Sequence, residues 1–344
     1  MKAINYTTHG GPDVLTYADV ADPEPGPADV VVAVEACGVN RLDIVQRNGW
    51  FTLPGFEFPH VAGMDVTGTV AEVGSAVTSV AVGDRVVVDP SLAGVADDSK
   101  LAGMGDLHGA LGIVGATVAG GYAERCLAPA THVYRVPDHI TVEQAATFPT
   151  TFLTAAHALF EVAGLSAGET VLIHAAGSGV SVAAIQLARA AGATVLATAG
   201  SQAKLDRAAE LGVAHGCNNR TTDVAAWVRE VTDGRGADVV FDHVGAALFE
   251  ASVMSLAIGG RLVCCGNTSG DTAAIPSLGF LYHSDAKILG SGPYRPEEFG
   301  RVWNTFCEHG FPAIVDAEFA LADAAGAHAR LEAGDVFGKI VLKP

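Results

Sequence analysis

The second half of the chain alternates short apolar segments with segments of helical period, and this alternation constrains the fold more than any other feature. The apolar segments predict strands at 170–177, 193–200, 213–219, 237–245, 261–267 and 286–291. The segments between them predict helices at 181–192, 203–212, 221–234 and 248–260. Strands that are apolar on both faces need helices over both faces, as in a parallel sheet. The sequence therefore predicts an α/β fold with a doubly wound parallel sheet.

The first 135 residues follow a different pattern, in which short β runs are broken by Gly, Pro and Asp. These runs predict strands at 30–39, 66–74, 84–90 and 132–138, so we expect a separate β-rich domain, such as a small antiparallel barrel. A helix is predicted over 140–165 with Thr141 as its N-cap. After residue 291 we expect turns and short elements that end in a strand at 338–344.

The charge and composition of the chain exclude several classes of function. A formal net charge of −18 opposes non-specific binding to nucleic acid or to an anionic membrane. The N-terminus lacks the apolar core of a signal peptide, and no apolar stretch approaches the ~20 residues of a spanning helix. The six cysteines form no C-x-x-C pair, so neither a zinc site nor a disulfide framework is predicted. We expect a cytoplasmic protein with a small-molecule substrate.

The segment 171–190 predicts a strand, a tight turn of small residues and a helix, which together can hold a pyrophosphate at the helix N-terminus. Its match to G-x-G-x-x-G is imperfect, so a tight turn without a ligand stays open as an alternative. The next strand ends at Ala199, where NAD-specific folds place an acidic residue. Ser201 and Lys204 follow, and they favour the 2′-phosphate of NADPH. The alternative is that Lys204 and Arg207 are ordinary exposed charges.

The segments 38–49, 65–87, 120–181 and 337–344 together resemble the medium-chain dehydrogenases/reductases, on the quinone oxidoreductase side. The resemblance covers essentially the whole chain. It implies a GroES-like catalytic domain built from residues 1–152 and 291–344, around a Rossmann NADP-binding domain at 153–290. It also implies a substrate site in the cleft between the domains, NADPH as the cofactor, and a homodimer or tetramer. Residues 286–291 are a candidate edge strand for the subunit contact.

The resemblance also implies that this chain has lost the zinc ions of its zinc-bearing relatives. The four cysteines of their structural lobe match Gly94, Asp97, Lys100 and His108 here, which cannot close a tetrahedral zinc site. The three catalytic zinc ligands match Asn40, Met64 and Thr150. An amide, a thioether and a hydroxyl do not hold Zn²⁺. Asp65 matches the glutamate beside the catalytic metal, and one carboxylate is not a zinc site. No metal is therefore expected.

Without a Lewis acid, hydride delivery favours a quinone or an α,β-unsaturated ketone, because conjugation delocalises the developing charge. The candidate catalytic residues are Asn40, Asp43, Arg47 and Asp65. The candidate pocket residues are Trp50, Phe51, Met64, Thr150, His243, Phe280 and Tyr294. The candidate cofactor-binding residues are Thr154, Gly177, Ser178, Gly179, Val180, Ser181, Ala199, Gly200, Ser201, Lys204, Gly266, Asn267 and Lys339.

Alternatives stay open for several of these assignments. Asp43 and Arg47 have helical spacing and can instead pair with each other. Each aromatic pocket candidate can equally belong to the core. No tyrosine or acid stands at Trp50 or Phe51 to protonate an enolate, so solvent is the expected proton source. Two other functions remain: a nicotinamide-binding protein with little turnover, and an alcohol dehydrogenase.

Overall fold

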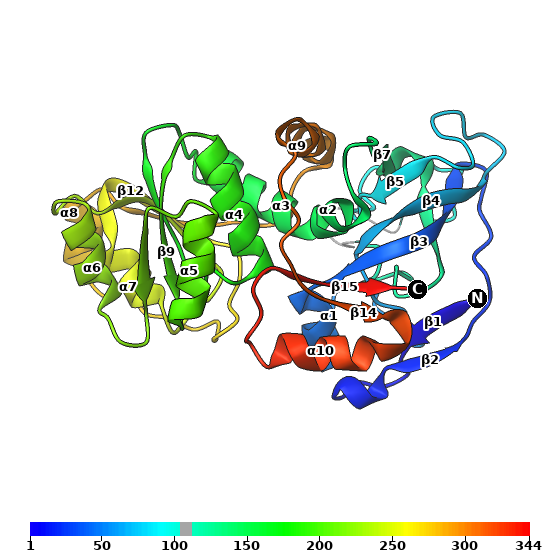
Figure 1. Ribbon diagram of the computed structural model, residues 1–344, viewed down its shortest axis with the longest axis horizontal. Helices are drawn as coiled ribbons and strands as arrows, with labels where there is room; N and C mark the ends of the chain where they lie inside the picture. Colours follow the sequence, from blue (N-terminus) through cyan, green and yellow to red (C-terminus); the bar gives the residue numbers. More distant parts are fainter. Residues whose placement is uncertain (104–111) are drawn as a thin grey trace. The chain divides into compact units, whose positions relative to one another are not determined.

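The computed structural model describes residues 1–103 and 112–344, which form two compact units (Figure 1). Unit 1 consists of Met1–Thr150 and Arg295–Pro344, and unit 2 consists of Thr151–Tyr294. Each unit has its own sheet and its own apolar core. No helix among the described residues is both long enough and apolar enough to cross a membrane.

Unit 1 is built on a seven-stranded sheet in the order β14-β15-β3-β4-β5-β7, with β6 also pairing with β3. Its strands are β3 (Asp29–Val39), β4 (Asp65–Val73), β5 (Arg85–Val88), β6 (Arg125–Pro129), β7 (Val133–Arg135), β14 (Val315–Ala320) and β15 (Lys339–Lys343). A separate two-stranded sheet joins β1 (Lys2–Asn5) to β2 (Thr16–Asp19). Because β15 pairs antiparallel with β3, the red end of the chain lies beside an early blue strand (Figure 1). The prediction of a β-rich, largely antiparallel domain is confirmed.

The helices of unit 1 differ from the expected pattern after residue 291, where the sequence predicted only turns and short elements. The structure has α9 (Pro296–His309) and α10 (Ala324–Glu332) there. α9 begins with Pro296 at its first turn and ends at Gly310, whose φ of 57° is left-handed. It buries Phe299 and Phe306. The proline and the glycine were the available signals for this helix.

The helix predicted over 140–165 is broken into three pieces, α2 (Val142–Thr147), α3 (Pro149–Ala156) and a π-helix at His157–Val162. Pro149 has no N–H to donate, so a new helix starts there. The predicted N-cap is confirmed, since the Thr141 hydroxyl accepts a hydrogen bond from Gln144 N. A shorter helix, α1 (Arg41–Arg47), follows β3.

Unit 2 has a six-stranded sheet in the order β10-β9-β8-β11-β12-β13, and every pair in it is parallel. The strands are β8 (Thr170–Ile173), β9 (Thr194–Ala199), β10 (His215–Asn218), β11 (Ala237–Asp242), β12 (Leu256–Cys264) and β13 (Lys287–Gly290). The helices are α4 (Gly179–Ala190), α5 (Gln202–Glu210), α6 (Val224–Val231), α7 (Phe249–Met254) and α8 (Leu278–His283). The predicted fold class is confirmed.

One helix of unit 2 is shorter than the sequence predicted. The expected helix at 248–260 ends at Met254, and β12 already begins at Leu256. Leu256 pairs with Ala237, and the register then shifts so that Arg261 pairs with Val239. Hydrogen bonding to β11 therefore overrides the local helical pattern of these residues.

Candidate functional site

A polar cluster in unit 1 forms where three strand ends meet. Asn40 follows the C-terminal end of β3, while Asp65 and Lys339 begin β4 and β15. Because β3 is antiparallel to both neighbours, its last residues lie beside their first ones, with Gly38 opposite Asp65. The sheet register thus gathers three candidates from distant parts of the sequence.

The ammonium group of Lys339 is the centre of this cluster. Nζ donates to Val39 O at 2.9 Å, to Asn40 Oδ1 at 2.7 Å and to Asp65 Oδ2 at 2.7 Å. An ammonium has three N–H donors, so all of them are used. The Lys339 side chain is 5% exposed and that of Asp65 is 0% exposed, so the two charges form a buried ion pair.

Asp65 and Asn40 are oriented by these contacts. The second carboxylate oxygen of Asp65 accepts from the backbone N of Thr150 at 2.9 Å and from the Thr150 hydroxyl. Because a lysine can only donate, the Asn40 atom facing it must be the oxygen, which resolves the amide orientation. Asn40 Nδ2 then faces away from Lys339, and it lies 3.4 Å from Gly38 O. That long contact leaves a donor for a ligand oxygen.

These residues do not fit a catalytic zinc ion. Asn40 and Asp65 bind the Lys339 cation, and Thr150 donates to Asp65. Met64 packs in an apolar cluster that includes Leu53. An amide, a hydroxyl and a thioether are poor ligands for Zn²⁺ in any case. Over residues 1–103 and 112–344, no three His, Cys, Asp or Glu side chains gather in a metal-ligating group.

The segment that matches the structural zinc lobe is attached to unit 1 by other contacts. The Ser99 hydroxyl and the Lys100 backbone N both donate to Asp29 at the start of β3. Leu101 is buried in the apolar core of unit 1. Gly94, Asp97 and Lys100 belong to this part of the chain, whereas His108 lies outside the described residues.

Asp43 and Arg47 lie on α1, and they do not pair with each other. Asp43 is buried and accepts from Asn40 N at 2.8 Å and from the Tyr122 hydroxyl at 3.1 Å. Burial raises the pKa of Asp43 to about 7. Arg47 is fully buried and donates to Glu332 Oε1 at 2.6 Å. The alternative of an Asp43–Arg47 pair is therefore wrong.

Tyr122 and His328, which were not among the predicted site residues, connect Asp43 to Arg47. Arg47 Nη1 lies 3.1 Å from His328 Nδ1, and His328 Nε2 lies 3.0 Å from the Tyr122 hydroxyl. Since arginine only donates, Nδ1 accepts and the imidazole proton lies on Nε2. Burial lowers the pKa of His328 to about 3, which keeps the ring neutral. The network fastens α1 to α10 and thereby holds Asn40. No motif marked His328 or Glu332.

The candidate pocket aromatics of unit 1 are exposed. Trp50 is 65% exposed and Phe51 is 53% exposed, although both are large and apolar. The Arg41 guanidinium lies 5.9 Å from the centroid of the Trp50 ring. These two rings offer apolar surface to a ligand, in contrast to Met64, which is buried.

In unit 2, the turn between β8 and α4 has the features of a phosphate-binding site. Ala175 adopts a left-handed φ of 50°, and Ser178 is the N-cap of α4 without a side-chain cap hydrogen bond. The first N–H groups of a helix have no intrahelical acceptor, so those of Gly179 and Val180 remain for an anion. The small residues Gly177 to Ser181 therefore fit a dinucleotide pyrophosphate.

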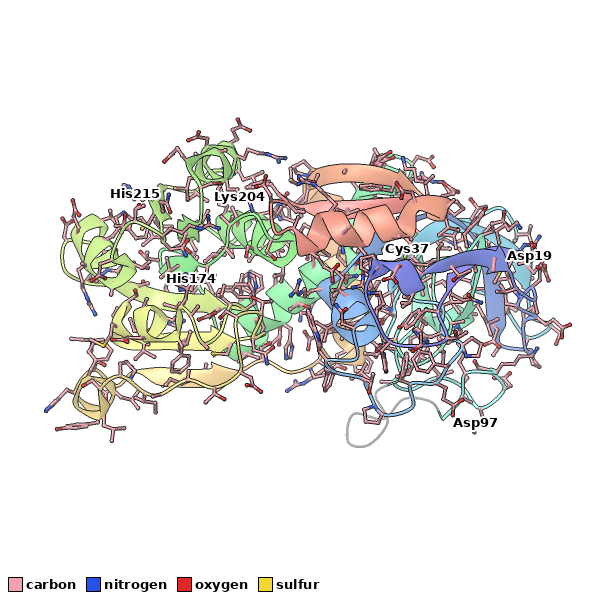
Figure 2. The ribbon with its side chains drawn as sticks, turned by 90° about the horizontal axis from the view of Figure 1, so that it is seen from below. Asp19, Cys37, Asp97, His174, Lys204 and His215 are labelled. Carbon is pink, nitrogen blue, oxygen red and sulfur yellow. The ribbon has the colours of Figure 1, made fainter. Side chains whose placement is uncertain are left out.

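A buried hydrogen-bond network joins this turn to the ends of β8 and β11. The Ser181 hydroxyl donates to His174 O at 2.7 Å, and it lies 2.8 Å from His243 Nε2. The His174 ring contacts Thr198 Oγ1 at 2.9 Å and Ser252 Oγ at 3.0 Å. Burial lowers the pKa of His174 to about 4, so this ring is neutral. His243 thus contacts the turn itself. Figure 2 labels His174.

The remaining candidates of unit 2 lie at the ends of strands or on helices. Ala199 ends β9, Gly200 follows it, and Ser201 is the N-cap of α5, again without a side-chain cap hydrogen bond. Lys204, labelled in Figure 2, is a half-buried residue of α5. Gly266 and Asn267 follow β12, and Thr154 lies on α3. Phe280 packs against the apolar core of unit 2, and Tyr294 is its last residue.

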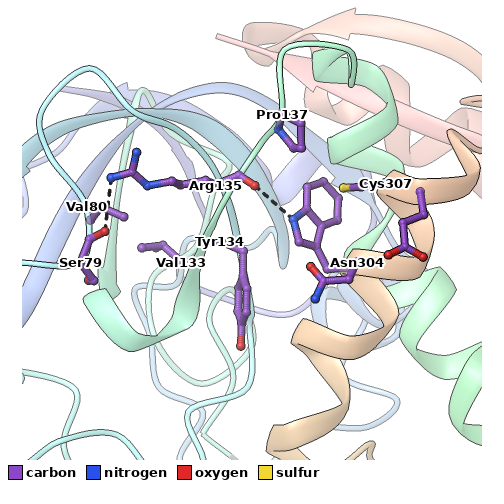
Figure 3. A pocket seen from close by; sticks show the side chains of 10 residues that line it. Ser79, Val80, Val133, Tyr134, Arg135, Pro137, Asn304 and Cys307 are labelled. Carbon is purple, nitrogen blue, oxygen red and sulfur yellow. Dashed lines mark hydrogen bonds between the residues drawn. The ribbon is translucent and has the colours of Figure 1, made fainter.

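A pocket of about 450 Å³ lies elsewhere in unit 1, beside α9 (Figure 3). Trp303 and Tyr134 line it, and Trp303 Nε1 donates to Arg135 O at 3.1 Å. None of the residues predicted from the sequence lines this pocket. It therefore adds nothing to the candidate site described above.

Comparison with known proteins gives consistent family matches. The alcohol dehydrogenase GroES-like domain matches residues 26–138, and the zinc-binding dehydrogenase family matches residues 179–308. The chain is 34% identical to a quinone oxidoreductase of Pseudomonas aeruginosa, over 100% of this chain and 99% of that protein.

Solved structures agree on the fold. The chain is similar to the crystal structure of an NAD-dependent alcohol dehydrogenase, with a TM-score of 0.92, 39% identity and 100% coverage of both chains. It is also similar to Escherichia coli quinone oxidoreductase complexed with NADPH, with a TM-score of 0.82, 28% identity and 100% coverage of both chains. The two proteins differ in named activity and cofactor, so the choice between them rests on residues of this chain.

Proposed function

Since the chain belongs to the medium-chain dehydrogenases/reductases and is a nicotinamide-type oxidoreductase, we propose that it reduces a quinone or an α,β-unsaturated ketone with NADPH, without a catalytic metal. One observation carries the metal-free part of this proposal. The ammonium of Lys339 is bound to Asn40 and Asp65, whose positions match a metal ligand and its neighbour in zinc-bearing relatives. A fixed cation already balances Asp65, so these side chains serve other roles.

A bound nicotinamide would supply the hydride to the conjugated substrate. Asn40 Nδ2 is the donor that meets the substrate oxygen, where negative charge develops during reduction. Lys339 holds Asn40 Oδ1, and Asp43 holds the Asn40 backbone N, so the amide is oriented before the substrate arrives. Trp50 and Phe51 provide apolar contact to the substrate. Solvent provides the proton.

Residues of unit 2 support binding of NADPH rather than NADH. The first turn of α4 fits the pyrophosphate, as described above. The end of β9 has Ala199 in place of a carboxylate that would repel a 2′-phosphate. Ser201, the N-cap of α5, and Lys204 in that helix follow as proposed donors for that phosphate. Gly266, Asn267 and Thr154 complete the proposed cofactor contacts.

The decisive experiment measures turnover of the purified protein with quinones, enones and alcohols, using NADPH and NADH. We expect NADPH oxidation with quinones or enones and little alcohol oxidation. Asn40→Ala should lower the kcat of the folded protein by about tenfold or more. Its melting temperature should fall as well, because Lys339 Nζ loses a buried acceptor. The control is Asn304→Ala, an exposed asparagine of α9, which should react as the parent does. Loss of stability in Asn40→Ala with normal specific activity would assign Asn40 a structural role only.

The same panel tests a second function, which the similarity to the NAD-dependent alcohol dehydrogenase favours. Turnover confined to alcohols with NADH would establish that function and overturn the reductase proposal. Cofactor binding without turnover on any substrate class would instead favour a binding protein. We further propose a cytoplasmic protein that assembles as a homodimer or tetramer, with β13 as the candidate contact because it is an edge strand of unit 2. Analytical ultracentrifugation measures the assembly.

A further inference from the structure

The strand order of unit 2 places a second basic residue beside the proposed 2′-phosphate site. β9 and β10 are parallel neighbours, with Asn218 opposite Ala199. The residues that follow the two strands therefore lie at the same edge of the sheet. Asn219 N donates to Ala199 O at 3.1 Å, which continues the pairing past the end of β10. Arg220 comes next in the chain.

The guanidinium group of Arg220 lies directly against Gly200. A Cβ atom added to Gly200 would be 2.8 Å from Arg220 Nε and 3.1 Å from its Cζ. The φ angle of Gly200 lies outside the left-handed region, so its backbone does not require glycine. The arginine side chain occupies the space that a Cβ atom at this position would fill, so a larger residue here would shift the guanidinium.

The backbone of Arg220 is held in this place by a local turn. The Asn218 side-chain oxygen accepts from Arg220 N at 3.0 Å, and Asn218 O accepts from Thr221 N at 3.2 Å. The side chain of Arg220 is exposed, and no carboxylate forms an ion pair with it among the described residues. The guanidinium therefore lies at the end of β9 with its charge unpaired.

We infer that Arg220 binds the 2′-phosphate of NADPH and sets the cofactor preference, an inference that rests on the proposed nicotinamide function. A guanidinium presents a planar fork of N–H donors that matches two phosphate oxygens. Its contact with Gly200 puts that fork against the residue directly after β9, the strand at whose end such folds contact the ribose. Arg220 thus adds to the Ser201 and Lys204 contacts that the sequence suggested.

The test measures binding rather than turnover, with 2′,5′-ADP and 5′-AMP as probes in titration calorimetry. The parent should bind 2′,5′-ADP more tightly than 5′-AMP. Arg220→Gln should weaken 2′,5′-ADP binding by about tenfold or more and change 5′-AMP binding less than about twofold. Arg220→Lys should fall between them, because it keeps the charge and loses the fork.

Two further variants separate this contact from general electrostatics. Gly200→Ala should weaken 2′,5′-ADP binding although no charge changes, because its methyl group displaces the guanidinium. Lys287→Gln removes one exposed positive charge from β13, the opposite edge strand of the sheet, and should bind both probes as the parent does.

The outcomes distinguish the inference from the proposed function. If the parent prefers 2′,5′-ADP and Arg220→Gln retains that preference, the inference is wrong and NADPH specificity stands on other residues. If Lys287→Gln loses as much affinity as Arg220→Gln, the effect is a general one and the inference is also wrong. If the parent binds both probes equally, both the role of Arg220 and the NADPH preference are overturned, while turnover with NADH still tests the oxidoreductase assignment.

Discussion

Replacing Lys339 by methionine should destabilise unit 1 strongly, because it removes one partner of a buried ion pair. Methionine keeps much of the unbranched stem and removes the charge. The carboxylate of Asp65 is 0% exposed, so it would remain buried without its counter-ion. Val39 O and Asn40 Oδ1 would also lose their donor. Breaking a buried pair from one side costs about 3–5 kcal/mol, and we expect a loss of that size.

A matched control and a double variant make the prediction specific. Lys343 lies on the same strand and pairs with Glu143 at 2.7 Å, but its side chain is 36% exposed. Lys343→Met should therefore cost less than about 1 kcal/mol. Adding Asp65→Asn to Lys339→Met removes the unpaired charge while the amide oxygen still accepts from Thr150. The double variant should recover stability, with a coupling energy of about 2 kcal/mol.

Urea unfolding measures these differences, followed by tryptophan fluorescence, to which Trp303, buried in unit 1, contributes. Because the chain has two units, the transitions must first be shown to coincide by circular dichroism and fluorescence. A loss in Lys339→Met no larger than that in Lys343→Met would refute the reasoning. So would purely additive effects of Lys339→Met and Asp65→Asn, because the two charges would then not interact in the folded protein.

Three further predictions concern pH and metal content. Burial raises the pKa of Asp43 to about 7, so the folded state holds this proton more tightly than the unfolded state. The free energy of unfolding should therefore decrease as pH rises from about 4 to about 7, and Asp43→Asn should flatten that part of a stability–pH profile. Burial lowers the pKa of His174 to about 4, so stability should fall as pH drops from about 6.5 to 4; His174→Gln should make this acid slope shallower, and an unchanged slope in urea titrations would contradict the assignment. The purified protein should contain no stoichiometric zinc by elemental analysis, and chelators should leave its Tm unchanged, because Lys339 already binds Asn40 and Asp65; one tightly held zinc per chain would contradict this.

The sequence predicted the sheet of unit 2 well because its signals are local. Continuous apolar runs and helical periods can be recognised within about ten residues, and the strand at 261–267 is seen in the structure as the second half of β12. The same local reasoning extended a helix to residue 260, where pairing with β11 prevails. It also missed α9, although Pro296 and Gly310 mark its ends.

For the candidate site, the sequence identified residues but not the contacts among them. Asn40, Asp65 and Lys339 were identified from the sequence, but for separate roles in catalysis and cofactor binding. Their hydrogen bonds join residues up to 300 positions apart, and no local sequence pattern can indicate a contact at that separation. The network from Asp43 through Tyr122 and His328 likewise depends on α10 packing against α1.

The amino-acid sequence by itself determined the alternation of strands and helices and the turn before α4, which are properties of residue type and near-neighbour spacing. The resemblance to zinc-bearing relatives implied the replacement of zinc ligands at Asn40 and Thr150. Only the tertiary structure decided that a lysine ammonium binds Asn40 and Asp65, and that Arg220 packs on Gly200. Such contacts depend on sheet register, which brings together residues distant in the chain and is set by the packing of whole elements.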